Sequence, residues 1–184
     1  MRVLAISGSL RAASNNTALL RVAAEEAPAG IEVDLWNDLR DVPPYDADDD
    51  LDPGPAAVEA LRDAVRDADA VLIATPEYNG SIPGALKNAV DWVSRPFPTN
   101  AFRNKPVAVI GTSHGAFGGV WSQAELRKVL GIVGARVAPV ELAVPLAEDK
   151  FGADGSLLDD ALRPLVRGAL ATLVDAASPD LVAA

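Results

Sequence analysis

Apolar segments that fit β-strands alternate with segments of helical spacing along the whole chain. The strand candidates are residues 2–7, 31–36, 70–76, 105–113 and 135–141, and the helix candidates are 16–27, 56–68, 84–94, 119–134 and 158–177. The first, third and fourth strands are apolar on both faces, as is typical of parallel strands covered by helices on both sides. The pattern therefore predicts an α/β three-layer sandwich with a five-stranded parallel sheet, right-handed crossovers and the strand order 2-1-3-4-5.

Length and charge limit the classes of protein that the chain can belong to. The 184 residues predict one domain, residues 1–184, with a substantial core. No apolar run approaches the roughly 20 residues of a membrane span, and the start "MRVLAISGS" is too short and strand-like for a signal peptide. The net charge of −10 disfavours nucleic acids and anionic membranes as partners.

The chain contains no cysteine. A disulfide framework, a thiolate metal site and an iron–sulfur cluster are therefore excluded. Together with the apolar and charge patterns, this composition favours a cytoplasmic protein.

Three loops rich in small and polar residues follow the first, third and fourth strands. They read "SGSLRAASNNT" (7–17), "TPEYNGSIPG" (75–84) and "GTSHGAFGG" (111–119). In a doubly wound sheet these loops lie side by side at the carboxyl ends of the strands, where such folds bind ligands. We therefore expect a small-molecule site that is formed by all three loops.

The first loop runs directly into a helix and carries Arg11 among hydroxyl and amide side chains. Free N–H groups and the helix dipole make such a terminus an anion site that suits a terminal phosphate. The alternative is that Ser14 or Asn15 only caps the helix, and spacing alone leaves both readings open. The loop contains neither GxGxxG nor the Lys-Ser/Thr of a Walker loop, which disfavours a nucleoside triphosphatase.

The second and third loops also allow more than one reading. The rigid turn between Pro76 and Pro83 suits the edge of a flat heteroaromatic ligand, but an ordinary β–α turn would look the same. His114 in the third loop is the only histidine, so a metal site built on it is not expected. A Ser-His-Asp triad lacks a GxSxG elbow in this sequence, and an exposed loop residue is the plainer interpretation of His114.

An acidic run, "YDADDDLDPG" (45–54), precedes the second predicted helix. It lacks the spacing and the closing Glu of an EF-hand calcium loop. We expect a solvated loop, with a rim near the ligand or a subunit contact as the alternative, and we expect no metal site.

At its loops the sequence resembles the NADPH-dependent FMN reductases, which include flavodoxin-like quinone and chromate reductases. "GSLRAASNNT" is similar to the phosphate loop of that family, and "TPEYNGSIPGALKNAVDWVSR" is similar to its long signature. "DVPPYDAD" and "DKFGADGSL" also match family segments, so the resemblance covers essentially the whole chain. The resemblance implies a flavodoxin-like fold.

The resemblance further implies that FMN is bound and that NADPH or NADH is the co-substrate. The residues that would hold the FMN phosphate are Ser9, Arg11, Ser14, Asn16 and Thr17. The residues that would border the isoalloxazine are Pro76, Glu77, Tyr78, Asn79 and Gly80, with Ser113 closing the third side. The cofactor carries the chemistry, so no side chain is expected to act as a catalytic acid, base or nucleophile.

The implied activity is hydride transfer from NAD(P)H to FMN and then to a quinone, free flavin or similar small acceptor, in ping-pong turnover. The alternatives are an electron carrier without NAD(P)H activity and a flavin-free regulatory relative. A homodimer is expected. Tetrameric relatives carry an Arg and a Tyr early in the fourth helix, facing a Glu of another subunit. This chain has Trp121 and Ala124 at those helix positions and Glu141 as the match for the Glu, which puts the tetramer in doubt.

Overall fold

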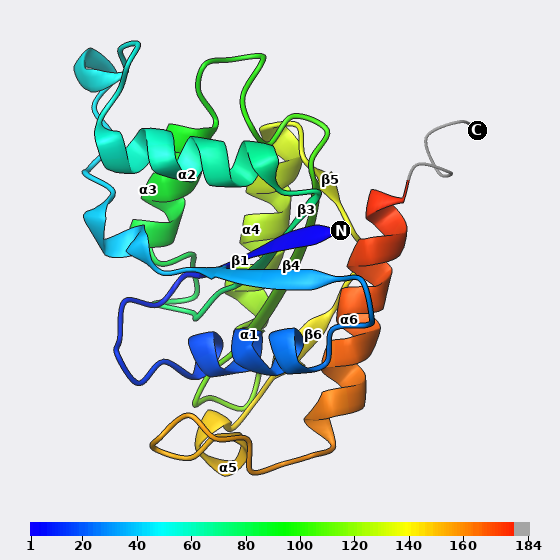
Figure 1. Cartoon of the computed structure of the whole chain (residues 1–184). Coiled ribbons are helices and arrows are strands. Elements are labelled where there is room, and N and C mark those ends of the chain that lie inside the picture. The colour runs from blue at the N-terminus through cyan, green and yellow to red at the C-terminus, as the bar shows by residue number, and fades with distance from the viewer. Residues whose placement is uncertain (179–184) are drawn as a thin grey trace.

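The computed structural model describes residues 1–178, in which six strands form one parallel sheet (Figure 1). The strands are β1 (Arg2–Ser7), β2 (Glu32–Trp36), β3 (Ala70–Ala74), β4 (Pro106–Thr112), β5 (Arg136–Val137) and β6 (Leu142–Val144). Their order is β2-β1-β3-β4-β5, and β6 also pairs with β4. The predicted α/β class, parallel pairing and strand order are confirmed.

The fifth predicted strand, residues 135–141, was wrong in extent. Of this segment, only the two residues of β5 pair with the start of β4. The separate strand β6 pairs with the end of β4. Pro139 has no N–H to give to the ladder, and the Val140 N–H turns back to the carbonyl of Ala138 at 2.8 Å. The edge of the sheet is therefore filled by two short strands, where one was expected.

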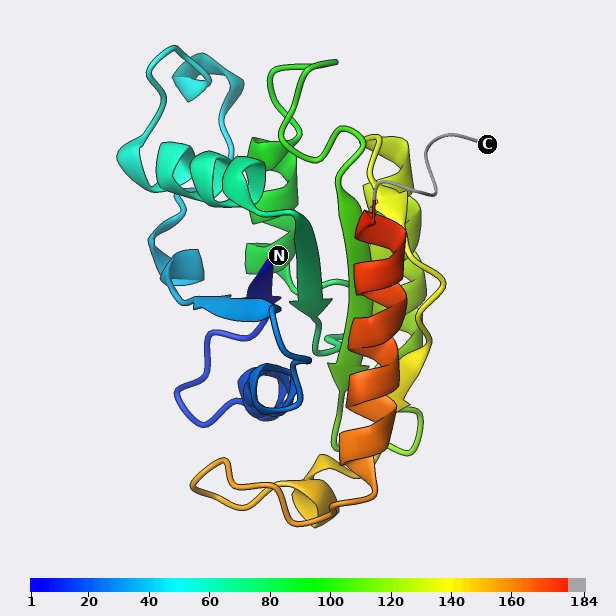
Figure 2. The same cartoon turned by 45° about the vertical axis from the view of Figure 1, so that its right-hand side comes forward.

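Helices cover both faces of the sheet (Figures 1 and 2). They are α1 (Asn15–Glu25), α2 (Ala56–Asp67), α3 (Gly84–Val93), α4 (Val120–Ile132), α5 (Ala147–Lys150) and α6 (Leu162–Ala177), with 3₁₀ turns at Asp38–Asp41 and Ala47–Asp49. The closing helix starts at Leu162, later than the predicted 158, and the short helix α5 was not predicted. Among residues 1–178, no helix has the length and apolar character needed to cross a bilayer.

Alternate residues of each strand face two separate apolar cores. Val3 and Ala5 of β1 pack in the core that contains α1 and α6. Leu4 and Ile6 pack in the core that contains α2, α3 and α4. Because successive side chains of a strand point to opposite faces, the continuous apolar pattern of the central strands follows from this double cover.

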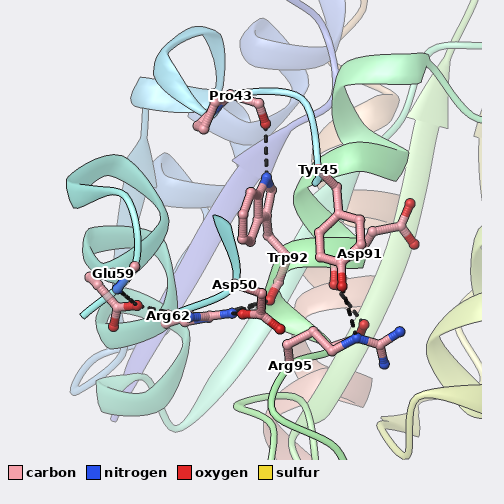
Figure 3. Close-up of polar contacts among 10 residues, drawn as sticks. Pro43, Tyr45, Asp50, Glu59, Arg62, Asp91, Trp92 and Arg95 are labelled. Atoms are coloured by element: carbon pink, nitrogen blue, oxygen red, sulfur yellow. Dashed lines mark hydrogen bonds and ion pairs between the residues drawn. The ribbon is translucent and has the colours of Figure 1, made fainter. Parts of the chain in front are cut away.

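A buried arginine fastens the acidic run to the helices beside it (Figure 3). Arg62 of α2 is only 4% exposed and donates to the Trp92 carbonyl at 3.1 Å, to Asp50 at 2.7 Å and to Glu59 at 2.8 Å. Burial by itself lowers the pKa of Arg62, but the hydrogen bonds to Asp50 and Glu59 outweigh it and raise that pKa. The loop 45–54 is thus held at Asp50, while Asp48 and Asp49 stay exposed.

Candidate functional site

The loops after β1, β3 and β4 meet around a cavity of about 290 Å³ at the carboxyl edge of the sheet. Its lining residues are Ser9, Arg11, Ser14, Asn15, Asn16, Pro76, Glu77, Tyr78, Thr112, Ser113, His114, Gly115 and Ala147. The sequence-predicted residues Thr17, Asn79 and Gly80 do not line it. The other predicted residues come together here from three separate loops.

The first loop supplies the donors at one end of the cavity. Ser14 is the N-cap of α1, and its hydroxyl accepts the Thr17 N–H at 3.2 Å. Arg11 is exposed, and its Nη2 donates to the carbonyl of Ala13 at 3.0 Å. The remaining guanidinium donors and the first N–H groups of α1 make this end suited to an anion.

Asn16 and Thr17 make contacts within the protein. The buried amide of Asn16 accepts the N–H of Thr112 and donates to the carbonyl of Thr112, each at 3.0 Å. The hydroxyl of Thr17 donates to Ser7 at 2.9 Å. Asn16 therefore ties the start of α1 to the end of β4, and a role of either residue in phosphate binding stays a prediction.

The second loop forms a stiff wall that is anchored to α4. One oxygen of Glu77, Oε2, accepts the backbone N–H groups of Trp121 at 3.0 Å and of Ser122 at 3.1 Å. Helix α4 follows Gly119, which has no side chain to cap it, so Glu77 supplies the cap from another loop. Its carboxylate is therefore committed to the helix, while the residue still lines the cavity.

Asn79 and Gly80 form the tip of a tight hairpin turn. Tyr78 and Ser81 exchange two backbone hydrogen bonds, at 3.2 and 3.1 Å. The φ angles of Asn79 and Gly80 are 54° and 74°, the left-handed pair that a type I′ turn requires. The turn fixes the backbone of Tyr78, whose half-exposed ring borders the cavity.

The third loop brings in His114, which sequence reasoning interpreted as an ordinary exposed residue. Its Nδ1 lies 2.9 Å from Oε1 of Glu148 in α5, and its Nε2 lies 3.5 Å from Nη1 of Arg11. No local pattern could reveal these partners, because Arg11 and Glu148 lie far from it in sequence. Within residues 1–178, no cluster of His, Cys, Asp or Glu side chains could hold a metal ion.

The residues around this cavity fit a ligand with an anionic end and a flat ring. The Ser9, Arg11 and Ser14 donors line it together with the segments Pro76–Tyr78 and Ser113–Gly115. Gly8 lets the first loop pass close to the side chain of Leu86, because a Cβ at this position would lie 2.7 Å from Leu86. These donors and walls suit a flavin mononucleotide, which has a phosphate and a flat ring.

The sequence is similar to those of known proteins over most of its length. The family model described as NADPH-dependent FMN reductase matches residues 1–149. The chain is 44% identical over 176 residues to an NAD(P)H-dependent FMN reductase of Pseudomonas aeruginosa, covering 94% of this chain and 93% of that protein. It is 44% identical over 138 residues to a quinone reductase of Escherichia coli, covering 74% and 73% of the two chains.

A solved structure shows the same fold over nearly the full length. It is FerB, a flavoenzyme NAD(P)H:acceptor oxidoreductase from Paracoccus denitrificans, with a TM-score of 0.85 and 37% identity. The match covers 96% of each chain. The overall fold is thus a feature that this chain has in common with a flavoenzyme.

Proposed function

Because the chain belongs to the NADPH-dependent FMN reductase family, we propose that its three-loop cavity holds FMN and passes reducing equivalents to a small quinone-like acceptor. The chain is a flavin-dependent NAD(P)H oxidoreductase, with FMN as cofactor and NAD(P)H as reductant. What we propose beyond this is which residues bind FMN, which molecule accepts the electrons and in which order the two substrates bind.

The phosphate of FMN is assigned to the first loop, where Ser9, Arg11 and Ser14 gather at the start of α1. The ring is assigned to the space between Pro76–Tyr78 and Ser113. Asn79 and Gly80 act indirectly, because the turn that they form positions Tyr78. Asn16 and Thr17 act by holding the first loop in place.

FMN, when bound, supplies the hydride chemistry, accepting from NAD(P)H and giving to the second substrate. The protein contributes position and electrostatics. Backbone N–H groups and Arg11 favour negative charge in the cavity, and the anchored wall at Glu77 keeps the ring edge fixed. We infer ping-pong turnover, in which the oxidised nicotinamide leaves before the acceptor enters the same space.

The observation that carries this proposal is the convergence of three distant loops on one cavity with a donor-rich end and a stiff wall. The test is anaerobic addition of NADPH to the FMN-loaded protein. Rapid loss of the visible flavin absorbance is the expected result. An unchanged spectrum would instead favour an electron carrier that has no NAD(P)H activity of its own.

The quinone acceptor is proposed because an Escherichia coli relative is named a quinone reductase.

A homodimer is proposed because Phe117 and Trp121 form an edge-to-face pair, with ring centroids 5.1 Å apart, although both are more than half exposed. Exposed paired aromatics are typical of association surfaces. A cytoplasmic location is proposed because reduced pyridine nucleotides are supplied inside the cell.

A further inference from the structure

His114 of the third loop takes its position from the short helix α5. The backbone carbonyls on either side of His114 accept the N–H groups of Ala147 at 3.0 Å and of Leu146 at 3.2 Å, which fixes the loop to the start of that helix. Glu148 follows directly, and its Oε1 lies 2.9 Å from the Nδ1 of His114. The imidazole is therefore held by its ring nitrogen and by its flanking backbone, although its side chain is half exposed.

The imidazole of His114 borders two cavities. It lines the three-loop cavity that we assign to FMN, the flavin cavity, together with Ser9, Arg11 and Ser14. It also lines the neighbouring cavity of about 680 Å³, to which Glu148 belongs, whereas Glu148 does not line the flavin cavity. One ring nitrogen thus meets the carboxylate, and the other, Nε2, lies 3.5 Å from Nη1 of Arg11 in the first loop.

The partner at Nδ1 decides where the ring of His114 carries its protons. An ionised carboxylate only accepts hydrogen bonds, so Glu148 keeps a proton on Nδ1. In the neutral ring Nε2 is then an acceptor, which suits the guanidinium of Arg11. A proton on Nε2 would make the ring a cation beside that guanidinium, and the two charges would repel each other. An anion that accepts a hydrogen bond from both groups would offset this repulsion.

The other charged groups around His114 favour an anion on the side of the flavin cavity. Arg21, Glu148 and Asp154 line the neighbouring cavity and do not line the flavin cavity. Glu77 lines the flavin cavity, but its Oε2 accepts two backbone N–H groups of α4. A phosphate in the flavin cavity would therefore meet the imidazole and the donors of the first loop, away from the carboxylates of the neighbouring cavity.

We propose that His114 is a ligand of the FMN phosphate, to which Nε2 donates a hydrogen bond, and that the ring takes up a proton when FMN binds. The inference rests on the proposed function, because it needs the phosphate beside Arg11. The proton comes from the solvent and is added to the Nε2 lone pair. A charged donor suits a phosphate monoester, and histidine changes its charge near neutral pH. Glu148 is a positioning residue, since it holds Nδ1 and stabilises the charged ring.

The test compares FMN with riboflavin, which has the same ring and ribityl chain but no phosphate, by calorimetric titration of the apoprotein. The variants are His114→Gln, which keeps a neutral donor, and Glu148→Gln. Asp149→Asn is the matched control, because Asp149 is the next exposed carboxylate of α5 and lines neither cavity. A thermal melt of each variant checks that the fold is retained.

The same titrations count protons. They are run in two phosphate-free buffers that differ in ionisation enthalpy, so that the difference in measured heat gives the number of protons taken up. The pH is about 7.5, where a phosphate monoester with a second pKa of about 6 is already a dianion. The uptake that is measured there therefore belongs to the protein.

We expect His114→Gln to weaken FMN binding by roughly tenfold and to leave riboflavin binding unchanged, because a charge-assisted hydrogen bond to the phosphate is lost. The parent should take up protons when FMN binds, and His114→Gln should lose this uptake. Glu148→Gln should weaken FMN binding and reduce the uptake, although it removes a negative charge near a phosphate. Asp149→Asn should change neither quantity.

Four results would overturn the inference. Unchanged FMN affinity in His114→Gln would remove the phosphate contact, and equal losses for FMN and riboflavin would place His114 against the ring or the ribityl chain. Equal proton uptake in His114→Gln and the parent would mean that another group is protonated. Tighter FMN binding in Glu148→Gln would mean that Glu148 only repels the phosphate.

The outcome can be separated from that of the proposed function. Binding is measured without NADPH, so it does not depend on flavin reduction. Loss of FMN affinity in Arg11→Ala, together with unchanged affinity in His114→Gln, would keep the proposed position of the phosphate and overturn only the role of His114.

Discussion

Gly80 is the residue whose backbone most directly constrains the wall of the flavin cavity. Its φ of 74° suits glycine, and nothing lies within 4 Å of the place where a Cβ would stand. Gly80→Val therefore strains the turn by about 1–2 kcal/mol without a clash, which a domain of this size survives. We expect a cooperative melt and a loss of most NADPH-driven quinone reduction, since a displacement of about 1 Å can cost on the order of a hundredfold in rate.

Steady-state rates at saturating FMN and a thermal melt check this prediction. Gly84→Val is the matched control, because Gly84 also has open space at its Cβ but no positive φ. Normal turnover in Gly80→Val would mean that this loop does not position the ring.

Arg11 is the cation of the first loop, and we expect Arg11→Ala to weaken FMN binding at least tenfold. A charge-assisted hydrogen bond to phosphate contributes about 1.5–3 kcal/mol, which corresponds to roughly that factor. Titration of FMN into the apoprotein measures it, with Asp48→Ala in the exposed acidic run as the control. An FMN affinity equal to that of the parent would place the phosphate elsewhere.

At the scale of elements, Arg62 joins α2, α3 and the acidic run. Arg62→Met leaves the Trp92 carbonyl and Asp50 without their donor, and we expect a loss of about 2–3 kcal/mol in unfolding free energy. Arg66→Met on the same helix removes only an exposed pair with Asp63 and should cost less than about 1 kcal/mol. Urea denaturation of both variants measures the two losses in unfolding free energy. Similar losses would mean that Arg62 does not hold the acidic run to the helices.

Helices α1 and α6 are joined through Glu26, whose pKa is lowered by hydrogen bonds from Arg167 and Arg163. A carboxylate whose pKa is lower in the folded than in the unfolded state stabilises the fold at pH values above its unfolded-state pKa. This stabilisation is lost as the pH falls through its folded-state pKa. We expect Glu26→Gln to lower Tm at pH 7 and to have little effect near pH 3. Melts across that range measure the difference, and a constant gap between variant and parent would contradict it.

At the scale of the whole molecule, the exposed pair of Phe117 and Trp121 predicts self-association. Replacing both by serine should raise the dimer dissociation constant by at least tenfold, because large apolar area would no longer be buried. Analytical ultracentrifugation measures it. Leu165→Ser on α6 is the control, since Leu165 is similarly exposed on a distant helix. A parent protein that sediments as a monomer would contradict the prediction.

The overall architecture could be predicted from the sequence because its cause is local. Each central strand carries a continuous apolar run, and most of the connections between elements carry glycine or proline. The split of the last strand depends on one missing donor at Pro139, and the pairing partner that would reveal it is distant in sequence.

The candidate site could be predicted only in part, for the same reason. The loops after β1, β3 and β4 could be identified from composition and resemblance. The pairing of Asn16 with Thr112, the cap that Glu77 gives to α4 and the contacts of His114 all join residues from separate loops or elements. Such contacts exist only once the sheet has placed those elements side by side.

The three tryptophans occupy three different surroundings, and each can serve as an optical reporter of one event. Trp92 is fully buried and hydrogen-bonded to Pro43, so its emission reports unfolding. Trp121 stands on the exposed aromatic pair and reports association. Trp36 lines a hollow beside the first loop and reports changes at that loop. A set of single-tryptophan variants would therefore separate folding, assembly and changes at the first loop by fluorescence in one unlabelled chain.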